Sequence, residues 1–272
     1  MKNIIAGIVI GIALLSNSSF AQDGRVLTNV ELQEKCDKND YSSCWLLGAS
    51  YGQGRGVQKD LVKEVELFTK ACDGGHANGC HSLGVMYYEG KGVRQDKFKA
   101  VELLTKACDS GSGWGCTYLG WMYANGDGVR QDKFKAVRLY TKACDGGDAS
   151  GCNNLSLMYD EGDGVRQDKF KAVELFTKSC DGAVASGCFN LGLKYYDGDG
   201  VRQDKFKAVD LYTKACDGGN ASGCLNLGVM YIKGETVQQD KFKALELFGK
   251  SCDLKSESGC KNYATLKSRM GK

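Results

Sequence analysis

Apolar residues recur at steps of three and four along a segment that returns many times in this chain. In one copy they are Phe170, Val173, Phe176 and Cys180. Side chains at such steps lie on one face of an α-helix. The pattern therefore predicts a helix that buries one stripe made of these four residues.

The ends of this predicted helix carry residues suited to capping. Asp168 precedes it, and an aspartate carboxylate accepts hydrogen bonds from the free N–H groups of the first turn. Asp181-Gly182 follows it, and we expect the glycine to adopt the left-handed conformation that ends many helices. A second helix is predicted over 149–159 (ASGCNNLSLMY), with Gly162 and Gly164 in the loop that joins the two.

The same two-helix pattern returns every 36 residues. The gaps between successive cysteines alternate between eight and 28 residues without exception, and a repeat of that length indicates stacked helix pairs. We expect an all-α, right-handed α-solenoid with a helix A and a helix B in each repeat. The predicted helix pairs span about 41–76, 77–112, 113–148, 149–184, 185–220 and 221–256, with an N-terminal half-repeat at 27–40 and a capping helix at 257–270.

The first residues of the chain have a different composition. One lysine precedes an apolar run from Ile4 to Leu15, and small residues stand at Ser19 and Ala21. This is the pattern of a secretory signal peptide, which we expect to occupy residues 1–21. The apolar run is shorter than the roughly 20 residues that cross a bilayer, so we expect no membrane span after cleavage.

Charge excludes one class of partner. The 36 basic and 33 acidic residues are interleaved, and the formal net charge is +3. No polybasic tract results, so we expect no nucleic-acid partner. The chain also has no proline, which permits a high helical content.

Fourteen cysteines in an exported chain indicate disulfides. A cysteine at the start of helix A could pair with the helix-B cysteine eight residues before it or with the one 28 residues after it. Pairing across eight residues uses every cysteine, whereas pairing across 28 leaves Cys36 and Cys260 alone. We therefore expect the pairs Cys36–Cys44, Cys72–Cys80, Cys108–Cys116, Cys144–Cys152, Cys180–Cys188, Cys216–Cys224 and Cys252–Cys260.

Each short ring is worth about 2–3 kcal/mol in the chain-entropy treatment of disulfides. Zinc is the alternative use of these cysteines. Paired ligands of structural zinc sites are separated by two to four residues, whereas seven residues separate each pair in this chain. Disulfides are therefore the better interpretation.

These units resemble Sel-1-like repeats, which are related to tetratricopeptide repeats, and more narrowly the Helicobacter cysteine-rich proteins. The resemblance spans Asn29 to about Leu266 and rests on motifs such as Leu83-Gly84, Met86-Tyr87, Gly126 to Asp132 and Lys207 to Gly219. It implies a helical repeat whose helix A lines the concave face. It also implies weak penicillin binding and β-lactam hydrolysis, which are associated with the cysteine-rich family.

Helix A has constant and variable positions when its copies are aligned by their cysteine. Leucine and tyrosine stand three and seven residues after the cysteine, and glycine stands four after it except at Ser156. Methionine stands six after it in four repeats, with Ser50 and Lys194 as the exceptions. These constants lie on one side of the helix, which we interpret as the packed side, with the glycine allowing close helix approach.

The variable positions lie on the opposite side and carry aromatic and amide residues. Solvent exposure alone does not favour large aromatic side chains, so we interpret this side as a binding surface. Asparagines at one register would form a ladder, because an amide can both donate to and accept from a peptide backbone; the alternative is that they are solvated helix residues. The predicted ligand-binding residues are Asn154, Asn190, Asn226, Trp121, Tyr118, Phe189 and Tyr196, and Trp45 and Tyr88 share the variable side.

Candidate catalytic and metal-binding residues are few. His76 and His81 are the only histidines and stand at variable positions, so we assign them neither role. The run from Asp197 to Gly200 resembles part of a calcium loop but lacks a third ligand at the expected step, so we expect no metal and no cofactor. No catalytic residue is assigned; if the chain hydrolyses β-lactams, Asp160 or Glu161 would act as acid or base.

Together these patterns predict a secreted or periplasmic, disulfide-rich scaffold. We expect it to be a monomer that binds a peptide or protein ligand, including a cell-wall fragment or a β-lactam, on its concave face. The alternative function is that of a weak penicillin-binding protein or β-lactamase.

Overall fold

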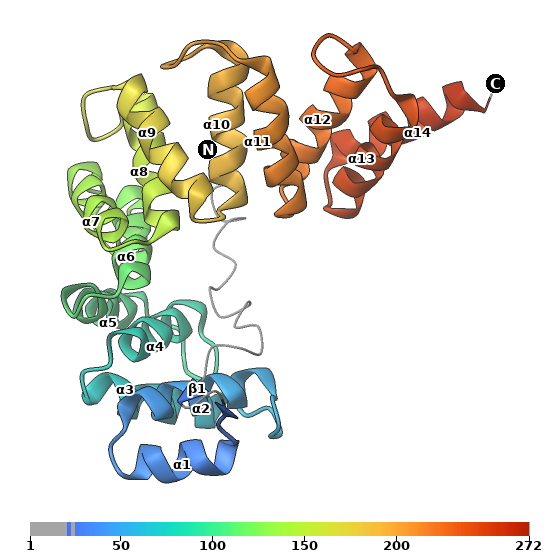
Figure 1. Ribbon diagram of the computed structural model, residues 1–272. Helices are drawn as coiled ribbons and strands as arrows, with labels where there is room; N and C mark the ends of the chain where they lie inside the picture. Colours follow the sequence, from blue (N-terminus) through green and yellow to red (C-terminus); the bar gives the residue numbers. More distant parts are fainter. Residues whose placement is uncertain (1–20, 23–24, 272) are drawn as a thin grey trace. The chain divides into compact units, whose positions relative to one another are not determined.

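The computed structural model describes residues 21–22 and 25–271 (Figure 1). The predicted signal peptide, residues 1–21, lies outside the described residues except for Ala21. Two short strands come first, β1 (Ala21–Gln22) and β2 (Arg25–Val26), and they pair antiparallel with Ala21 opposite Val26. Every later element is a helix.

Fourteen helices follow in the described part of the chain, so the predicted all-α class is confirmed. Helices of type A and type B alternate, and each of α2 to α13 contains 13 residues. Their bounds are α1 (Asn29–Asp37), α2 (Tyr41–Gln53), α3 (Leu61–Asp73), α4 (Ala77–Glu89), α5 (Lys97–Asp109), α6 (Gly113–Asn125), α7 (Lys133–Asp145), α8 (Ala149–Glu161), α9 (Lys169–Asp181), α10 (Ala185–Asp197), α11 (Lys205–Asp217), α12 (Ala221–Lys233), α13 (Lys241–Asp253) and α14 (Glu257–Met270).

The helices form two compact units. Unit 1 ends at Gly146 and contains α1 to α7, and unit 2 begins at Gly147 and contains α8 to α14. Within each unit every helix packs against the next one along the chain. Contacts between A helices of successive repeats join α2 to α4, α4 to α6, α8 to α10 and α12 to α14. None of the described helices is long and apolar enough to cross a membrane.

The caps agree with the sequence at the start of helix B but not at its end. Asp168 accepts a hydrogen bond from the Lys171 N–H at 2.9 Å, as predicted. Gly162, which ends α8, is left-handed with φ of 74°. Gly182, however, has φ of −79°, so its predicted left-handed conformation is wrong. The left-handed residue is Ala183, with φ of 59°, because α9 continues through one more turn residue before the chain reverses.

The recurring glycine of helix A marks a close approach, as predicted. A Cβ atom on Gly192 would lie 2.7 Å from Cε1 of Tyr212, and a Cβ atom on Gly228 would lie 2.7 Å from Cε1 of Phe248. Helix A thus receives the ring of its own helix B at this position. The exception, Ser156, is fully buried, and its hydroxyl donates to the Asn153 carbonyl at 2.6 Å.

The predicted stripe of helix B is wrong at one residue. Phe176 and Cys180 are buried, but Phe170 is 78% exposed. The buried arc includes Ala172, and a residue two positions earlier lies about 200° away around a helix. Phe170 therefore lies on the outer side of α9, although its spacing from Val173 and Phe176 fits a single stripe.

Disulfides join the end of helix B to the start of the next helix A. Each spans eight residues, the separation favoured from the sequence, and brings the Cα atoms within 4.4–4.7 Å. Cys144 and Cys152 are disulfide-bonded as well. The pairs that the structure defines are Cys36–Cys44, Cys72–Cys80, Cys108–Cys116, Cys180–Cys188, Cys216–Cys224 and Cys252–Cys260.

Candidate ligand-binding surface

Three asparagines stand at one register on the A helices of unit 2. They are Asn154 on α8, Asn190 on α10 and Asn226 on α12, and all three are partly exposed. Helices α8 and α10 are in contact. We call these three residues the amide row.

Two members of the amide row already bond to neighbouring groups. The Asn190 side-chain N–H donates to Oδ1 of Asn153 at 3.5 Å. Burial raises the pKa of Tyr212 to about 12, and a hydrogen bond with Asn226 opposes that rise. Each amide has two donors and two acceptor positions, so these bonds leave capacity for a ligand.

Apolar side chains accompany the amide row. Leu157, Leu193 and Val229 follow its members by three residues, which places them beside the asparagines on the same helix surface. All three are partly buried. We call these six residues the helix-A surface of unit 2. Its amides can bond to a peptide main chain, and its apolar side chains can pack on the side chains of that peptide.

Two predicted aromatic residues of unit 2 border this surface. Phe189 is half-buried, with its ring centroid 6.0 Å from that of Tyr212. The Lys205 ammonium lies 5.3 Å from the centre of the Tyr196 ring. Both aromatic rings are therefore engaged with the protein and retain only part of their surface for a ligand.

The predicted exposure of Tyr118 and Trp121 is wrong. These residues are 7% and 6% exposed. Their rings pack against Tyr88, with centroid distances of 5.4 Å to Tyr118 and 5.7 Å to Trp121. The cause is the contact of α4 with α6, which turns the variable side of one A helix toward the next. Their role in ligand binding remains a prediction without geometric support.

Tyr88 completes a polar group beside these rings. Its hydroxyl donates to Oδ2 of Asp127 at 2.6 Å, and the Lys97 ammonium donates to Oδ1 of Asp127 at 2.6 Å. Burial, with the adjacent Asp127, raises the Tyr88 pKa above its usual range. Trp45 on α2 is similarly engaged, since its indole N–H donates to the Ser82 hydroxyl at 3.0 Å.

The two histidines have structural roles in unit 1. Nδ1 of His76 accepts a hydrogen bond from the Gly79 N–H at 3.1 Å and so caps α4. His81 packs among aromatic rings, 6.1 Å from Trp114 and 6.3 Å from Tyr118 between centroids. Burial lowers the pKa of His81 to about 4.

Lys194 stands six residues after the helix-A cysteine, at one of the two exceptions to methionine, and the sequence alone assigned it no role. It is 9% exposed where four other repeats have methionine. Its ammonium lies 2.5 Å from Oδ1 of Asp160 and 2.6 Å from Oδ2 of Asp199. Lys169 also pairs with both carboxylates, at 2.9 and 3.2 Å. The hydrogen bond from Lys194 holds the pKa of Asp199 below its ordinary value. The signal in the sequence was a charge at a register that has methionine in four repeats and serine in one.

This charge network bears on the suggested catalytic and calcium-binding groups. Asp160 and Asp199 are each paired with two ammonium groups. Asp160 is therefore not a free acid or base, and Asp199 is not a free calcium ligand. Glu161 is exposed at the end of α8. Within residues 21–22 and 25–271, no group of three or more His, Cys, Asp or Glu side chains is arranged to hold a metal ion.

One Ser-x-x-Lys tetrapeptide does occur in the chain, at 258–261. Serine β-lactamases use this motif to activate their nucleophile. Here Ser258 and Lys261 are both exposed in the first turns of α14, and Cys260 between them is tied to Cys252. The tetrapeptide therefore lies on an exposed turn of α14.

Solved structures of repeat proteins are similar to this chain. A protective antigen of uropathogenic Escherichia coli strains is 29% identical, with a TM-score of 0.73, over 90% of this chain and 53% of the antigen. This chain thus spans about half the length of that antigen. A Sel1 repeat protein of Oxalobacter formigenes is 22% identical, with a TM-score of 0.74, over 82% of this chain and 89% of that protein.

Cysteine-rich proteins also match. Helicobacter pylori cysteine rich protein B is 37% identical over 50% of this chain and 97% of that protein, with a TM-score of 0.40. No curated protein sequence matches the chain. The Sel1 repeat family profile matches six segments, residues 42–76, 77–112, 115–148, 149–183, 185–220 and 221–256. The chain belongs to the Sel1 repeat family.

Proposed function

We propose that this protein is a disulfide-braced scaffold that binds an extended peptide, or an extended segment of a protein, along the helix-A surface of unit 2. The observation that carries the proposal is the amide row. Asn154, Asn190 and Asn226 share one register on successive A helices, and each remains partly exposed.

The spacing of the A helices suits an extended ligand. Packed helices lie about 8–10 Å apart, and an extended chain advances about 3.3 Å per residue. Asn154 and Asn190, on the packed helices α8 and α10, would therefore lie about three residues apart along a bound peptide. The intervening peptide side chains would pack on Leu157, Leu193 and Val229, which are partly buried.

The disulfides favour a rigid binding surface and a location outside the cytoplasm. A rigid surface loses less conformational entropy when it binds a ligand, and a covalent link at each repeat corner restrains a stack whose repeats contact only their neighbours. Disulfides persist in oxidising compartments, which indicates a site of action outside the cytoplasm. We propose secretion or a periplasmic location, and the protective-antigen designation of the Escherichia coli relative agrees with this placement.

Peptide selection against the immobilised protein tests the proposal. A library of random peptides is panned, and the affinity of a selected peptide is measured by calorimetry for wild type and for the Asn190→Ala/Asn226→Ala variant. We expect about thirtyfold weaker binding by the variant, since a net hydrogen bond is worth about 1 kcal/mol and two are removed. Gln238→Ala is the matched amide control, because Gln238 is exposed in the loop before α13.

The outcomes separate the proposal from its alternatives. Retention of wild-type affinity by the double asparagine variant, with an unchanged circular dichroism spectrum, would refute the role of the amide row. Failure to enrich any peptide would refute peptide binding. Sustained nitrocefin turnover by the native protein, absent from a heat-denatured sample, would instead favour β-lactam hydrolysis.

A further inference from the structure

Five of the B helices, α5, α7, α9, α11 and α13, have an exposed phenylalanine at their second position. Such large, exposed apolar side chains at a fixed register are typical of interaction surfaces. They are distinct from the helix-A surface, because they lie on the B helices. The exposed fractions are 79% for Phe98, 69% for Phe134, 78% for Phe170, 71% for Phe206 and 78% for Phe242.

An arginine stands four residues before the phenylalanine in four of these repeats. The pairs are Arg94 with Phe98, Arg130 with Phe134, Arg166 with Phe170, and Arg202 with Phe206. All four arginines are exposed. Among the described residues, no hydrogen bond, ion pair or ring contact engages their guanidinium groups. We call these residues the Arg-Phe row and consider it separately in each unit.

The charged groups around Phe206 are partly engaged within the protein. In unit 2, Lys207 donates to the Tyr195 hydroxyl at 2.7 Å, and Lys205 lies 3.6 Å from Glu235. Asp204 accepts from the Lys207 backbone N–H at 3.0 Å and so caps α11. Lys205 is paired with a carboxylate, whereas Lys207 donates to a neutral hydroxyl and keeps its charge. The cations left for a partner are therefore Arg202 and Lys207.

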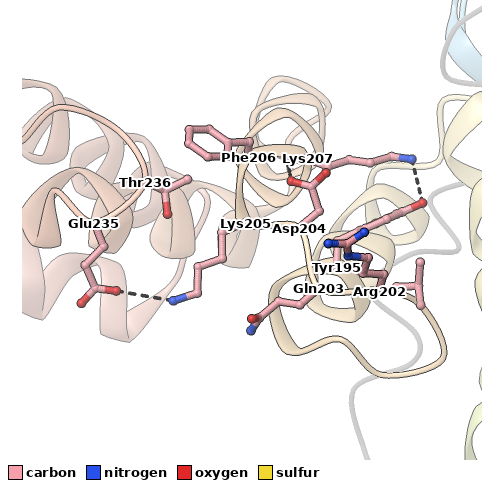
Figure 2. A pocket seen from close by; sticks show the side chains of 10 residues that line it. Tyr195, Arg202, Gln203, Asp204, Lys205, Phe206, Lys207, Glu235 and Thr236 are labelled. Atoms are coloured by element: carbon pink, nitrogen blue, oxygen red, sulfur yellow. Dashed lines mark hydrogen bonds and ion pairs between the residues drawn. The ribbon is translucent and has the colours of Figure 1, made fainter.

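Hollows lie beside the phenylalanines. The hollow in unit 2 has a volume of about 600 Å³ and is open to solvent, and Figure 2 shows Arg202, Lys205 and Phe206 around it. Its counterpart in unit 1, of about 850 Å³, is lined by Phe98 and Phe134 from successive B helices and by Arg130. In each unit a hollow thus lies beside at least one exposed phenylalanine and one arginine.

The positive charge and the shape of the Arg-Phe row favour one kind of ligand over the others. A second copy of this chain would place arginine against arginine, which is repulsive. A carboxylate suits the guanidinium, because the two form paired, charge-assisted hydrogen bonds. A flat bilayer surface would contact the projecting rings but would not fill hollows between them, whereas a narrow chain can follow rings and hollows in turn.

We propose that the Arg-Phe row binds an extended acidic segment of a partner protein. Carboxylates of that segment pair with the arginines, and its apolar side chains pack beside the phenylalanines in the hollows. The site is independent of the helix-A surface, so the protein would hold two different chains on opposite helices of each repeat.

Fluorescence anisotropy tests this second site. The probe is a labelled peptide of alternating aspartate and leucine, long enough to span two repeats, and it is titrated with the full disulfide-bonded chain. We expect binding that weakens about tenfold or more in Arg166→Gln/Arg202→Gln, since each charge-assisted bond is worth at least that factor. A similar loss is expected for Phe170→Ser/Phe206→Ser, whose exposed side chains can be replaced without loss of core packing.

Lys178→Gln/Lys214→Gln is the charge-matched control, because both lysines are exposed in the last turn of their B helices. We expect this control variant to bind the peptide within about twofold of wild type, since distant exposed charges are screened by salt.

Equal losses of affinity in the arginine and lysine variants would overturn the proposal, because they indicate unspecific charge attraction. Absence of peptide binding would overturn it as well, and binding of phosphatidylglycerol vesicles that depends on Phe170 and Phe206 would assign the row to a membrane. Because the Asn190→Ala/Asn226→Ala variant keeps the row intact, failure here and failure of the helix-A surface are distinguishable.

Discussion

The Lys194 ammonium lies 2.6 Å from Oδ2 of Asp199, at a register where four other repeats have methionine. Lys169 lies 3.2 Å from the same carboxylate oxygen. The network therefore contains two ammonium groups and, with Asp160, two carboxylates. Removal of Lys194 would leave each carboxylate with one cationic partner.

We predict that Lys194→Met keeps the free energy of unfolding at pH 7 within about 1 kcal/mol of wild type, or raises it. Replacement of a buried ion pair by a well-packed apolar side chain is often neutral or stabilising, and Lys169 remains to pair with both aspartates. Lys194→Ala is the contrasting variant and should lose about 2–4 kcal/mol, since it leaves a cavity in addition. Urea denaturation under non-reducing conditions measures both. A loss of several kcal/mol in Lys194→Met would mean that the network itself stabilises the fold.

The Lys194–Asp199 ion pair also predicts how the free energy of unfolding depends on acid pH. Lys194 holds the Asp199 pKa below its ordinary value of 3.8. A lowered pKa gives stability that is complete above the unfolded value and is lost as the pH falls through the folded value. We therefore expect wild type to lose more stability than Lys194→Met as the pH falls from about 5 to below 3.8. Parallel pH profiles of the urea midpoint for the two proteins would contradict this coupling.

Gly192 gives a prediction about packing. Alanine is favoured over glycine in a helix interior by about 1 kcal/mol, yet a Cβ atom at Gly192 would lie 2.7 Å from the Tyr212 ring. We expect Gly192→Ala to lower the free energy of unfolding by about 1–3 kcal/mol, because overpacking costs more than the gain in propensity.

Gly249 is the control for that variant. It lies inside α13, and a Cβ atom there would be 3.4 Å from Tyr263, which is ordinary contact. Gly249→Ala should therefore be neutral or stabilising by up to about 1 kcal/mol. If both alanine variants stabilise the protein, the close approach of α10 and α11 does not constrain Gly192.

The sequence was sufficient for the repeat and its corners because both depend on local spacing. The cysteines eight residues apart, the aspartate before α3, α5, α7, α9, α11 and α13, and the recurring glycine four residues after the helix-A cysteine all act within one repeat or between neighbours. The identity of the buried arc on helix B was not determined this way. Phe170 fits the same steps as Phe176, and only the position of Ala172 against helix A shows which side is inside.

The candidate site was less predictable because it depends on how A helices meet one another. Variability at Tyr118 and Trp121 indicated a surface, but contact between α4 and α6 buries both. The asparagines stand at similarly variable positions and stay partly exposed. Lys194 was visible as an exception to methionine, but its two carboxylate partners come from different loops and helices. No rule of spacing within one helix identifies them.

Ala183 provides a prediction at a repeat corner. It adopts φ of 59°, whereas Gly75, Gly111, Gly147 and Gly219 occupy the equivalent left-handed position in other repeats. A left-handed residue with a Cβ atom is strained by about 1–2 kcal/mol. We expect Ala183→Gly to raise the free energy of unfolding by about 1 kcal/mol after the added flexibility of the unfolded chain is deducted. Gly219→Ala should have the opposite effect, and a destabilised Ala183→Gly would show that the corner is not strained.

The partly buried His81 predicts how unit 1 responds to mild acid. Its pKa is lowered to about 4 from an ordinary value of 6.5, because it packs against Trp114 and Tyr118 and its charged form is poorly solvated. The folded state therefore binds this proton less readily than the unfolded state, so stability is complete above about pH 6.5 and falls as the pH approaches 4. In His81→Phe, which has the residue found at the equivalent Phe189, we expect that fall to be smaller by at most about 3 kcal/mol, since one pKa unit corresponds to about 1.4 kcal/mol. Urea midpoints measured between pH 7 and 4.5 test this prediction. The carboxylates titrate alike in both proteins, so the difference between the two profiles isolates the histidine.

The His76→Asp variant is the control. Asp148 caps the equivalent helix α8, so the aspartate should cap α4 and the His81 contribution should persist. Identical pH profiles for wild type and His81→Phe would mean that the ring is solvated when protonated, with the aromatic cluster opening around it.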